Sequence, residues 1–575
     1  MRKTGAQILV DALIQEKVKV LFGYPGGVVI PIFDVLYETK EVRFVLTRHE
    51  QAAAHAADGY ARATGEVGVC IATSGPGATN LITGIATAYL DSIPLVAITG
   101  QVASPLLGTD AFQEADVVGI TRPITKHNFL VKRIEELPIM LKQAFHIART
   151  GRPGPVLIDI PIDVSRAYLD DYQYPGSVSI RSYRPNVVGH MRQIKKAADM
   201  INSSKKPLIY AGGGVIISGA HEELLALAEK TNIPVTTTLM GLGGFPGSHP
   251  LFIGMPGMHG SKAANYTLQE CDLIISVGAR FDDRVTGYVA KFAPNASVIH
   301  MDIDPAAISK IIKVDIPVVG DARNILTSLI PLVNPRRADE WNSLVNQWLE
   351  GGLFTYTDSK TDIKPQSVIK ALYRITGGDA IIATEVGQHQ MWTAQYYMFD
   401  KPRTLISSGG LGTMGFGMPA AMGAALSNPG KPVIDIAGDG SIQMNIQELA
   451  TLSMNRIPVK VVILNNGYLG MVRQWQELFY ERRYSSTCLM TGSLCDGCTG
   501  PDTCKKTYIP DFVALANSYG IKAFRTDRPD CIDETLRAGL AVDGPAIMEF
   551  IVAREENVFP MVPAGKPIDE ILEGS

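Results

Sequence analysis

Short apolar runs that end in glycine, serine or threonine recur along the chain, and segments with helical periodicity separate them. Runs of this length are typical of buried strands, and their alternation with helices predicts doubly wound parallel sheets of the α/β class. The strand-like stretches fall into three groups: VKVLFGYPGG, GVGVCIATSG and PLVAITG; KPLIYAGGG, CDLIISVGAR and SVIHMDID; and AIIATEVG, KPVIDIAGDGS, VKVVILNN and GPAIMEFIVA.

Three such groups predict three doubly wound parallel-sheet domains, because 575 residues are too many for one hydrophobic core. We expect an N-terminal domain over residues 1–170, a central domain over 188–335 and a C-terminal domain over 365–555, followed by a tail at 556–575. The polar stretch SRAYLDDYQYPGSVSIRSYRPN indicates a linker between the first two domains. No internal repeat is evident in the sequence.

Charge and hydropathy exclude several classes of partner. The net charge of -4 gives no basic footprint, so nucleic acid is not expected as a partner. Asp11, Glu16 and Lys17 interrupt the first apolar stretch, which argues against a signal peptide. Uncharged stretches occur at 67–90 and 404–430, but their glycine clusters indicate backbone packed around a ligand rather than a membrane span. We therefore expect a cytoplasmic enzyme without membrane contact.

The stretch TRHEQAAAHAADGYA, residues 47–61, places Glu50 at the start of an alanine-rich helix. A helix of such small residues is expected to pack closely against a neighbour and to bury Glu50. A buried carboxylate is costly unless it has a partner. Glu50 is therefore a candidate functional residue.

The motif GDGS carries the clearest chemical signal in the chain. Asp439 follows one strand-like run directly, and Asn466 ends the next, after an intervening helix. The carboxyl ends of parallel strands meet at one edge of a sheet, where ligands bind. Mg²⁺ prefers carboxylate and amide oxygens together with phosphate oxygens. Gly438, Gly440 and Ser441 would bring main-chain N–H groups and a helix N-terminus to a diphosphate. A lone GDG is a plain turn, but this spacing predicts a magnesium–diphosphate site.

The GDG and NN spacing resembles the signature of thiamin diphosphate enzymes, and nearly the whole chain resembles one family among them. That family is the catalytic large subunit of acetohydroxyacid synthase, also called acetolactate synthase. The matching passages are FGYPGG, RHEQAAAHAADGYARATG, SGPGATN, GTDAFQE, GARFDDRVTG, HMDID, GQHQMW, LGMVRQWQ and NVFPMVPAGKPIDEIL.

The resemblance implies a carboligase that decarboxylates pyruvate and transfers the hydroxyethyl unit to a second 2-keto acid. Pyruvate as acceptor would give 2-acetolactate and 2-ketobutyrate would give 2-aceto-2-hydroxybutyrate, the first common step toward valine, leucine and isoleucine. Two enzyme alternatives share this architecture: a relative with another acceptor, and a pyruvate oxidase-like flavoenzyme in which FAD accepts electrons. A non-catalytic binding or sensor protein is a third, disfavoured because it would need neither Glu50 nor Asp439.

Carried over residue by residue, the resemblance assigns roles around thiamin diphosphate. Glu50 would hydrogen-bond the aminopyrimidine ring, Met414 would wedge the cofactor into shape, and Arg284 would hold the carboxylate of the acceptor. For Arg284 the alternative is an ion pair with an adjacent aspartate, and for Met414 it is a place in the core. The remaining assignments are Phe112 and Gln113 at the reaction centre, Trp475 in the acceptor pocket, Gln388, His389, Gly412, Gly438, Gly440 and Ser441 at the cofactor, and Asp439, Asn466 and the main-chain oxygen of Tyr468 on Mg²⁺.

In the resembling family the central domain binds FAD, which takes no redox part in the reaction. The residues alone support only a nucleotide site, because glycine-rich strand ends followed by an acid fit any dinucleotide. The expected FAD contacts are Arg152, Gly212, Gly213, Thr238, Leu239, Gly257, Met258, His259, Gly278, Arg280, Asp282, Asp302, Ile303 and Asp321.

The resemblance also implies an assembly. Family members build each site across a dimer interface, with Glu50 and the magnesium motif on different domains, so we expect at least a homodimer and, as an alternative, a homotetramer. A small regulatory subunit is a further candidate partner.

Two features depart from the family pattern. Ile162 stands in LIDIPIDV, where the family usually carries a lysine nearby, which could alter substrate binding. The second departure is a cysteine-rich insertion at residues 485–508. Its thiols could bind zinc or an iron–sulfur cluster, form a redox disulfide, or serve no such role; they are Cys488, Cys495, Cys498 and Cys504.

Overall fold

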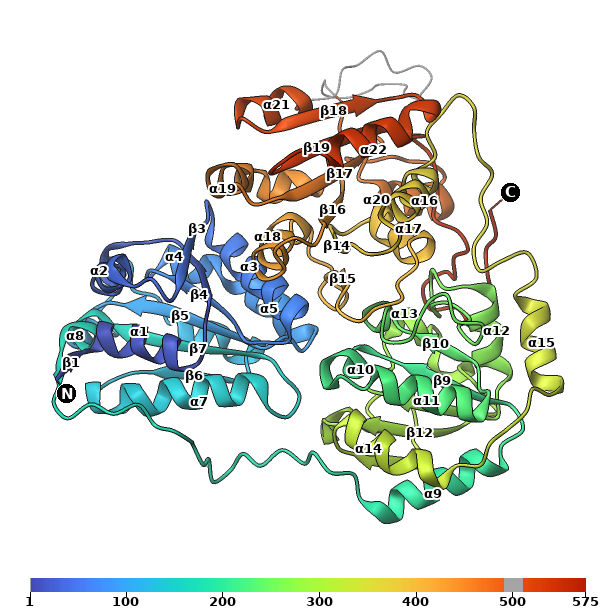
Figure 1. Ribbon diagram of the computed structural model, residues 1–575, viewed down its shortest axis with the longest axis horizontal. Coiled ribbons are helices and arrows are strands. Elements are labelled where there is room, and N and C mark those ends of the chain that lie inside the picture. The colour runs from blue at the N-terminus through green and yellow to red at the C-terminus, as the bar shows by residue number, and fades with distance from the viewer. Residues whose placement is uncertain (1, 491–509, 575) are drawn as a thin grey trace.

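The computed structural model describes residues 2–490 and 510–574. Within them, three parallel α/β sheets confirm the predicted fold class (Figure 1). The N-terminal sheet has the strand order β3-β2-β4-β5-β7-β6. Its strands are β2 (Val20–Gly23), β3 (Arg43–Leu46), β4 (Gly68–Ala72), β5 (Leu95–Gln101), β6 (His127–Leu130) and β7 (Pro155–Pro161), beside the two-stranded pair β1 (Lys3–Thr4) and β8 (Tyr168–Leu169). Its helices are α1 (Gly5–Gln15), α2 (Ile30–Glu38), α3 (Glu50–Thr64), α4 (Pro76–Asn80), α5 (Ile82–Leu90), α6 (Val117–Thr121), α7 (Leu137–Arg149) and α8 (Ile162–Arg166).

The C-terminal sheet repeats this topology. Its order is β15-β14-β16-β17-β19-β18, which is the N-terminal order with every strand number raised by the same amount. The strands are β14 (Ile381–Thr384), β15 (Leu405–Ile406), β16 (Val433–Gly438), β17 (Val459–Asn465), β18 (Lys522–Thr526) and β19 (Ala546–Ile551). The helices are α16 (Pro365–Thr376), α17 (Gln388–Tyr396), α18 (Gly417–Ser427), α19 (Leu449–Asn455), α20 (Gly470–Phe479), α21 (Phe512–Ser518) and α22 (Ile532–Leu540).

The central sheet has the order β10-β9-β11-β12-β13 and all its strands are parallel. Its strands are β9 (Pro207–Ala211), β10 (Val235–Thr237), β11 (Leu273–Val277), β12 (Ser297–Asp302) and β13 (Ile316–Val319). The helices of this part are α9 (Met191–Ser203), α10 (Gly213–Ser218), α11 (His221–Thr231), α12 (Lys262–Glu270), α13 (Asp283–Thr286), α14 (Ala322–Leu329) and α15 (Glu340–Trp348).

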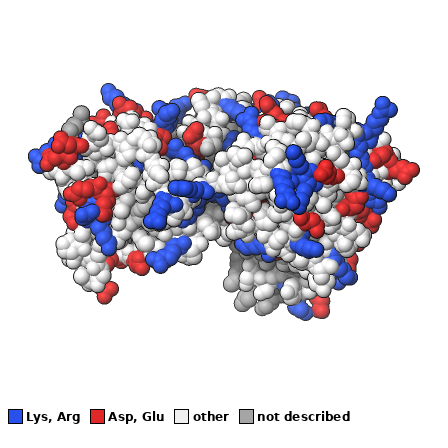
Figure 2. All heavy atoms as spheres, turned by 90° about the horizontal axis from the view of Figure 1, so that it is seen from below, with Lys and Arg blue, Asp and Glu red and all other residues white. Residues whose placement is uncertain are grey.

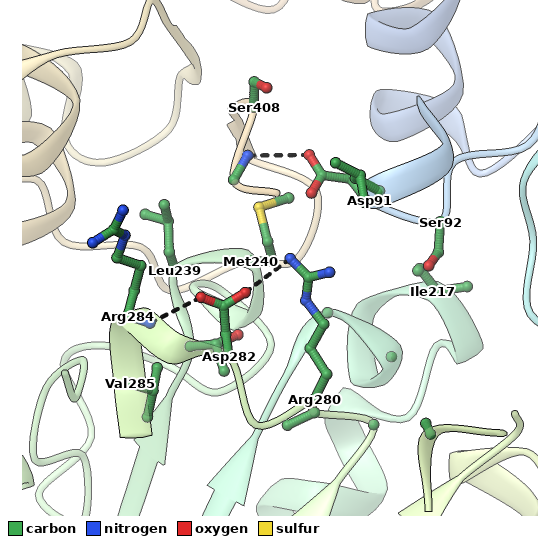
Figure 3. Close-up of a pocket in the computed structure, with 18 of the residues that line it drawn as sticks. Asp91, Ser92, Ile217, Leu239, Met240, Arg280, Asp282, Arg284, Val285 and Ser408 are labelled. Carbon is green, nitrogen blue, oxygen red and sulfur yellow. Dashed lines mark hydrogen bonds and ion pairs between the residues drawn. The ribbon is translucent and has the colours of Figure 1, made fainter. Parts of the chain in front are cut away.

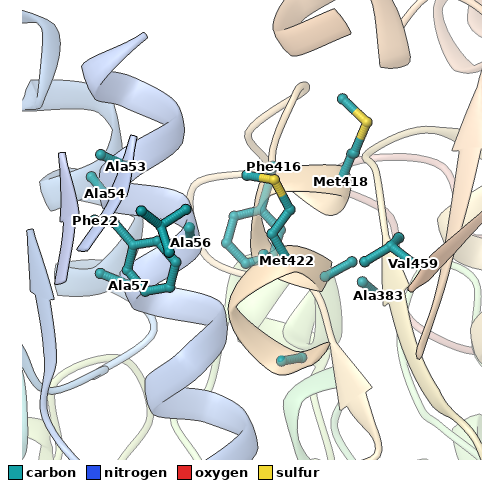
Figure 4. Close-up of a cluster of buried hydrophobic side chains, with 14 of the residues drawn as sticks. Phe22, Ala53, Ala54, Ala56, Ala57, Ala383, Phe416, Met418, Met422 and Val459 are labelled. Atoms are coloured by element: carbon teal, nitrogen blue, oxygen red, sulfur yellow. The ribbon is translucent and has the colours of Figure 1, made fainter. Parts of the chain in front are cut away.

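The N-terminal and C-terminal sheets are joined by the helices α3 and α18, which occupy equivalent places in the two repeats (Figure 4). Their backbones approach so closely that side chains are excluded at the crossing. A Cβ on Gly59 would lie 2.1 Å from the carbonyl oxygen of Ala420, and one on Gly423 would lie 1.9 Å from that of Ala56. The alanine-rich pattern therefore serves this packing, and Glu50 at the start of α3 is buried as expected, at 9% exposure.

A buried group of charges strengthens the same junction. The Arg62 guanidinium contacts the carboxylates of Asp58 and Asp91 at 2.5 and 2.9 Å and donates to the carbonyl oxygen of Ser407. Asp91 in turn accepts from the main-chain N–H of Gly410 at 2.7 Å. Removing one member of such a buried group leaves an uncompensated charge, at a cost of about 3–5 kcal/mol. The charges thus fix the loop that leads to Met414 against the N-terminal repeat.

A linker and the C-terminal tail each run between different sheets of the molecule. Residues 173–190 form no helix or strand and run beneath the molecule to the central sheet (Figure 1). The first part of the predicted linker differs, because it contains the end of α8 and strand β8. The last residues return to the central part, where the N–H of Val562 donates to the carbonyl oxygen of Met258. Acidic and basic side chains are mixed over the face shown in Figure 2. No helix within the described ranges is long and apolar enough to cross a membrane.

Candidate active site

The predicted meeting of GDG and NN is found at the carboxyl edge of the C-terminal sheet. Gly438 of β16 pairs with Leu464 of β17, so the two strands end side by side. The carboxylate of Asp439 accepts the main-chain N–H of Gly467 at 3.0 Å. The side chain of Asn466 donates to Gln388 Oε1 at 3.3 Å. Two of the predicted oxygen ligands, Asp439 and Asn466, and the predicted cofactor contact Gln388 therefore lie within one small region.

His389 forms one wall of this region. A Cβ on Gly438 would lie 2.7 Å from His389 Nδ1, so glycine is required for the turn to pass the ring. The side chain is 6% exposed, and its Nε2 has no hydrogen-bond partner within residues 2–490 and 510–574. Burial lowers the pKa of His389 to about 3, so the imidazole is neutral at physiological pH. A buried and unpartnered ring nitrogen beside a glycine turn fits a polar ligand in the turn.

Glu385 is a site residue that the sequence analysis missed. Its Oε2 accepts the main-chain N–H of Gly415 at 2.6 Å and the hydroxyl of Ser441 at 2.7 Å, and its Oε1 accepts the N–H of Met418 at 3.2 Å. This carboxyl group ties the Met414 loop to the GDGS turn. Burial raises its pKa despite these donors. An acid at the end of the apolar run AIIATEVG was the available signal.

A second buried acid, Asp435, lies near Glu385. Asp435 on β16 is fully buried, and neither of its carboxyl oxygens has a hydrogen-bond partner in the part of the chain that the structure describes. Burial, and then the neighbouring Glu385, raise its pKa well above the usual value. Both causes favour the neutral form of the Asp435 carboxyl group. Its place inside the strand VIDIAG gave no sign of this arrangement.

A cavity of about 950 Å³ adjoins this region and is lined by all three parts of the chain (Figure 3). Met414, Gly412 and Trp475 line it from the C-terminal part, and Arg284 lines it from the central part. Of the expected FAD contacts, those that line it are Arg152, Gly213, Thr238, Leu239, Met258, His259, Gly278, Arg280, Asp282, Asp302, Ile303 and Asp321.

Gly212 and Gly257 do not line the cavity, but each packs against the backbone of a residue that does. A Cβ on Gly212 would lie 2.4 Å from the carbonyl oxygen of Gly278, and one on Gly257 would lie 2.4 Å from that of Arg284. Both positions therefore need glycine because backbone segments pack against each other. His259 Nδ1 on the cavity wall is buried and has no hydrogen-bond partner among the described residues, which fits a polar ligand there. Burial raises the pKa of Asp302 to about 6.

Among the described residues, the carboxylate contact that Arg284 makes through its guanidinium is a long one, to the adjacent Asp283. Asp282 is used by Arg280, at 3.1 Å, and by the main-chain N–H of Arg284 at the start of α13 (Figure 3). Asp283 lies 3.9 Å from the Arg284 guanidinium, and both side chains are exposed. The guanidinium carbon lies 6.0 Å from the centre of the Trp475 ring, so the two predicted acceptor-site residues are neighbours.

Glu50, Phe112 and Gln113 lie elsewhere, around the turn at residues 75–77. Asn80 donates to Glu50 Oε2 at 3.0 Å, and a Cβ on Gly77 would lie 3.3 Å from Glu50 Oε1. A Cβ on Gly75 would lie 2.9 Å from the Gln113 backbone. Phe112 is 88% exposed. These three residues are not part of the cavity lining that the structure describes, so within one chain the predicted site residues form two groups.

Cys488 is the one predicted cysteine ligand within the described residues. Its sulfur lies 3.8 Å from an Arg554 side-chain nitrogen, and its backbone pairs with Tyr468, beside the magnesium motif. Cys495, Cys498 and Cys504 lie outside the described residues. Across residues 2–490 and 510–574 no group of three or more His, Cys, Asp or Glu side chains is arranged to hold a metal ion. The zinc, iron–sulfur, disulfide and idle-thiol interpretations therefore stay predictions.

Comparison with known families gives matches in all three parts of the chain. Residues 3–120, 194–329 and 385–550 match the N-terminal TPP binding, central and C-terminal TPP binding domains of thiamine pyrophosphate enzymes. The chain is 51% identical to the acetolactate synthase large subunit of Corynebacterium glutamicum, covering 99% of this chain and 90% of that protein. It is 48% identical to the acetolactate synthase isozyme 3 large subunit of Escherichia coli, covering 99% and 98%.

The chain belongs to the acetolactate synthase large-subunit family. A probable acetolactate synthase large subunit of Methanocaldococcus jannaschii is 50% identical over 99% of this chain and 95% of that protein. Membership confirms the resemblance of the sequence motifs and makes the chain a thiamin diphosphate-dependent enzyme. The matched C-terminal segment contains Glu385, the GDGS turn and Asn466, so the cofactor-binding family model covers the site described above.

Proposed function

We propose that this chain is a carboligase that makes 2-acetolactate from two molecules of pyruvate, or 2-aceto-2-hydroxybutyrate from pyruvate and 2-ketobutyrate. One observation carries the choice of reaction: Arg284 and Trp475 lie together on the wall of the cavity that Met414 also lines. An arginine without a close carboxylate partner suits the carboxylate of an acceptor acid, because its planar guanidinium can bond it at two points. An oxidase has no need of an acceptor acid.

Mg²⁺ and the diphosphate are proposed to bind at the GDG edge. Asp439, Asn466 and the main-chain oxygen of Tyr468 would hold Mg²⁺ through oxygen ligands, which this ion prefers. Gln388 and His389 would contact the diphosphate, with Gly438, Gly440 and Ser441 supplying main-chain and hydroxyl donors. The unpartnered His389 Nε2 and the glycine turn support this assignment.

Each remaining residue is proposed to have a distinct task. Thiamin diphosphate, when bound, supplies the nucleophilic ring carbon and the electron sink for decarboxylation. Glu50 would hold a proton at N1′ of the aminopyrimidine, and Met414 would keep its two rings in contact. Arg284 would orient the acceptor through its carboxylate. Trp475 and the apolar side chains of Met471 and Val472 would exclude water, which would otherwise divert the donor unit to acetaldehyde.

FAD is proposed to occupy the cavity as a non-redox cofactor. We expect Asp302→Ala to weaken FAD binding about 10- to 150-fold, because a hydrogen bond to a charged group contributes roughly 1.5–3 kcal/mol. Thiamin diphosphate binding should change little in that variant. Flavin fluorescence during a titration measures the affinity, and Asp199→Asn on the exposed face of α9 is the matched control. Unchanged FAD affinity in Asp302→Ala would contradict this placement.

The two separate groups of site residues support a proposed homodimer. In such a dimer Glu50, Phe112 and Gln113 of one chain would complete the site of the other chain. The N-terminal domain, proposed at 1–170, would present the pyrimidine-binding face. The central domain at 188–335 would bind FAD, and the C-terminal domain at 365–555 would bind the diphosphate. A homotetramer, a small regulatory subunit and a cytoplasmic location are further proposals, the subunit because the relatives are named large subunits.

The reaction itself is tested by supplying the purified protein with pyruvate, thiamin diphosphate, Mg²⁺ and FAD. We expect 2-acetolactate and CO2, and 2-aceto-2-hydroxybutyrate when 2-ketobutyrate is added. The flavin absorbance should remain that of the oxidised form throughout turnover. Reduction of the flavin with formation of an acetyl product would instead favour the oxidase alternative, and CO2 without a carboligation product would reject the proposed function.

A further inference from the structure

Glu448 is a buried acid that joins two distant parts of the chain, and none of the roles above uses it. It ends the helical segment η9 (Ile442–Glu448), which follows the GDGS turn, and it is 0% exposed. Its Oε1 accepts the main-chain N–H groups of Arg48 at 2.8 Å and His49 at 3.0 Å. The C-terminal sheet region thus holds the two residues directly before Glu50.

Thr451 completes this contact from the first turn of α19. Its hydroxyl lies 2.6 Å from Glu448 Oε2 and 3.3 Å from the carbonyl oxygen of Leu46. The two side chains therefore fasten the whole β3–α3 connection, from Leu46 to His49. Both are fully buried, so water does not compete for these hydrogen bonds.

The fastened connection sets where Glu50 begins its helix. His49 is the N-cap of α3, and its side chain accepts the N–H of Gln51 at 3.1 Å. Glu50 is the first residue of α3, and Asn80 bonds its carboxylate. A reacting group displaced by about 1 Å can lose 10²-fold in rate. The position of the Glu50 carboxyl therefore depends on the two residues before it.

We propose that Glu448 is the positioning residue of Glu50: it fixes the main chain that presents the Glu50 carboxyl to the cofactor. The proposal rests on the role given to Glu50 above. The turn that would seat the diphosphate leads directly into η9, which ends at Glu448. Glu448 would therefore also link this turn to the main chain before Glu50.

The contact needs hydrogen-bond acceptors at Glu448 more than it needs a charge. Burial raises the pKa of Glu448 to about 7, against the opposing effects of the Thr451 hydroxyl, the two main-chain N–H groups and the Arg48 guanidinium. A glutamine at this position keeps one oxygen to accept both N–H groups and carries no charge. Alanine removes the acceptors and leaves two buried N–H groups unpaired.

The test compares Glu448→Ala with Glu448→Gln in the full chain. We expect Glu448→Ala to lower kcat for 2-acetolactate about 10–100-fold, the effect of a misplaced catalytic group. The KM for pyruvate should stay within about threefold, and the affinity for thiamin diphosphate within about tenfold, because Glu50 would make only one hydrogen bond to the cofactor. Glu448→Gln should retain turnover within about threefold of the unaltered chain.

A second measurement separates positioning from general destabilisation. Exchange of the thiazolium C2 proton of bound thiamin diphosphate with deuterium, followed by NMR, reports the function of Glu50 directly. Glu448→Ala should slow this exchange, yet add little further slowing in a Glu50→Gln background, because residues that act through one another are not additive. Full additivity, or unchanged exchange in Glu448→Ala, would overturn the proposal.

Two controls keep the outcomes distinct. The unaltered chain must bind thiamin diphosphate and make 2-acetolactate; failure there rejects the proposed function rather than the role of Glu448. Where Glu448→Ala does not fold, Thr451→Val removes one partner of Glu448 and leaves the acid in place. That variant should slow C2 exchange a few-fold, and an unchanged exchange rate in it would equally overturn the proposal.

Discussion

Glu50→Gln is expected to lower the rate of 2-acetolactate formation about 10³–10⁴-fold, at the upper end of what a positioned acid–base group contributes. Glutamine has nearly the same shape as glutamate and can still accept the hydrogen bond from Asn80, which now lies at 3.0 Å. It cannot hold and return a proton. The loss should therefore appear in kcat, while α3 keeps its packing against α18.

The assay measures steady-state product formation together with titrations of thiamin diphosphate and Mg²⁺. Affinity for both is expected to stay within about tenfold, because Asp439 and its neighbours are untouched and one hydrogen bond contributes about 1 kcal/mol. Glu66→Gln is a matched control, since Glu66 follows the same helix but is exposed. Near-full turnover by Glu50→Gln would contradict the role given to this carboxyl group.

The strands that the sequence predicted are those with both faces buried. All ten apolar runs identified in the sequence form strands in the three parallel sheets. Those that it missed include β3, β6, β15 and β18, which lie at sheet edges and are short or partly polar. An edge strand is covered on one side only, so it leaves a weaker apolar pattern. β7 was missed for another reason, because prolines stand at both of its ends.

The internal repeat also escaped the sequence analysis. The N-terminal and C-terminal sheets have the same strand order, and α3 and α18 are equivalent helices that pack together. Their sequences differ because each helix meets different demands: α3 begins with Glu50, whereas α18 begins at Gly417, where a Cβ would lie 2.2 Å from Asp435 Oδ1. Many different sequences can form buried strands in the same order, so two domains can share a topology without visible sequence similarity.

Some residues of the candidate site could be predicted from the sequence and others could not, again for physical reasons. The meeting of Asp439 with Asn466 could be predicted because strand ends in one β-α-β unit must be adjacent. Glu385 and Glu448 could not, because their partners are main-chain groups far away in the sequence, 400 residues in the case of Arg48. Because nearly every residue type has a main-chain N–H group, the sequence does not show which residue donates to such a carboxyl group. Only the folded chain brings these groups together.

Asp439→Ala is expected to abolish thiamin diphosphate binding that depends on Mg²⁺. Removing a residue that only hydrogen-bonds a metal ligand lowers metal affinity about 10–100-fold. Removing the carboxylate ligand itself should therefore lower the affinity for Mg²⁺ by ~100-fold or more. Asp439 is 1% exposed and fixes the turn by accepting the N–H of Gly467. Asp439→Asn keeps an oxygen for that N–H and removes the charge, so it isolates the electrostatic part of the loss.

Titration of thiamin diphosphate at several Mg²⁺ concentrations, followed by isothermal calorimetry, distinguishes the two variants. The unaltered chain should bind more tightly as Mg²⁺ rises, and both variants should lose that dependence, Asp439→Ala more completely. Asp543→Asn is the matched control, because Asp543 is an exposed aspartate of the same α/β unit that pairs with Arg456. FAD binding should persist in both variants, because its proposed cavity does not include Asp439 among its described lining residues. A variant that loses both cofactors has lost its fold, whereas Mg²⁺-dependent affinity that survives in Asp439→Ala places the metal elsewhere.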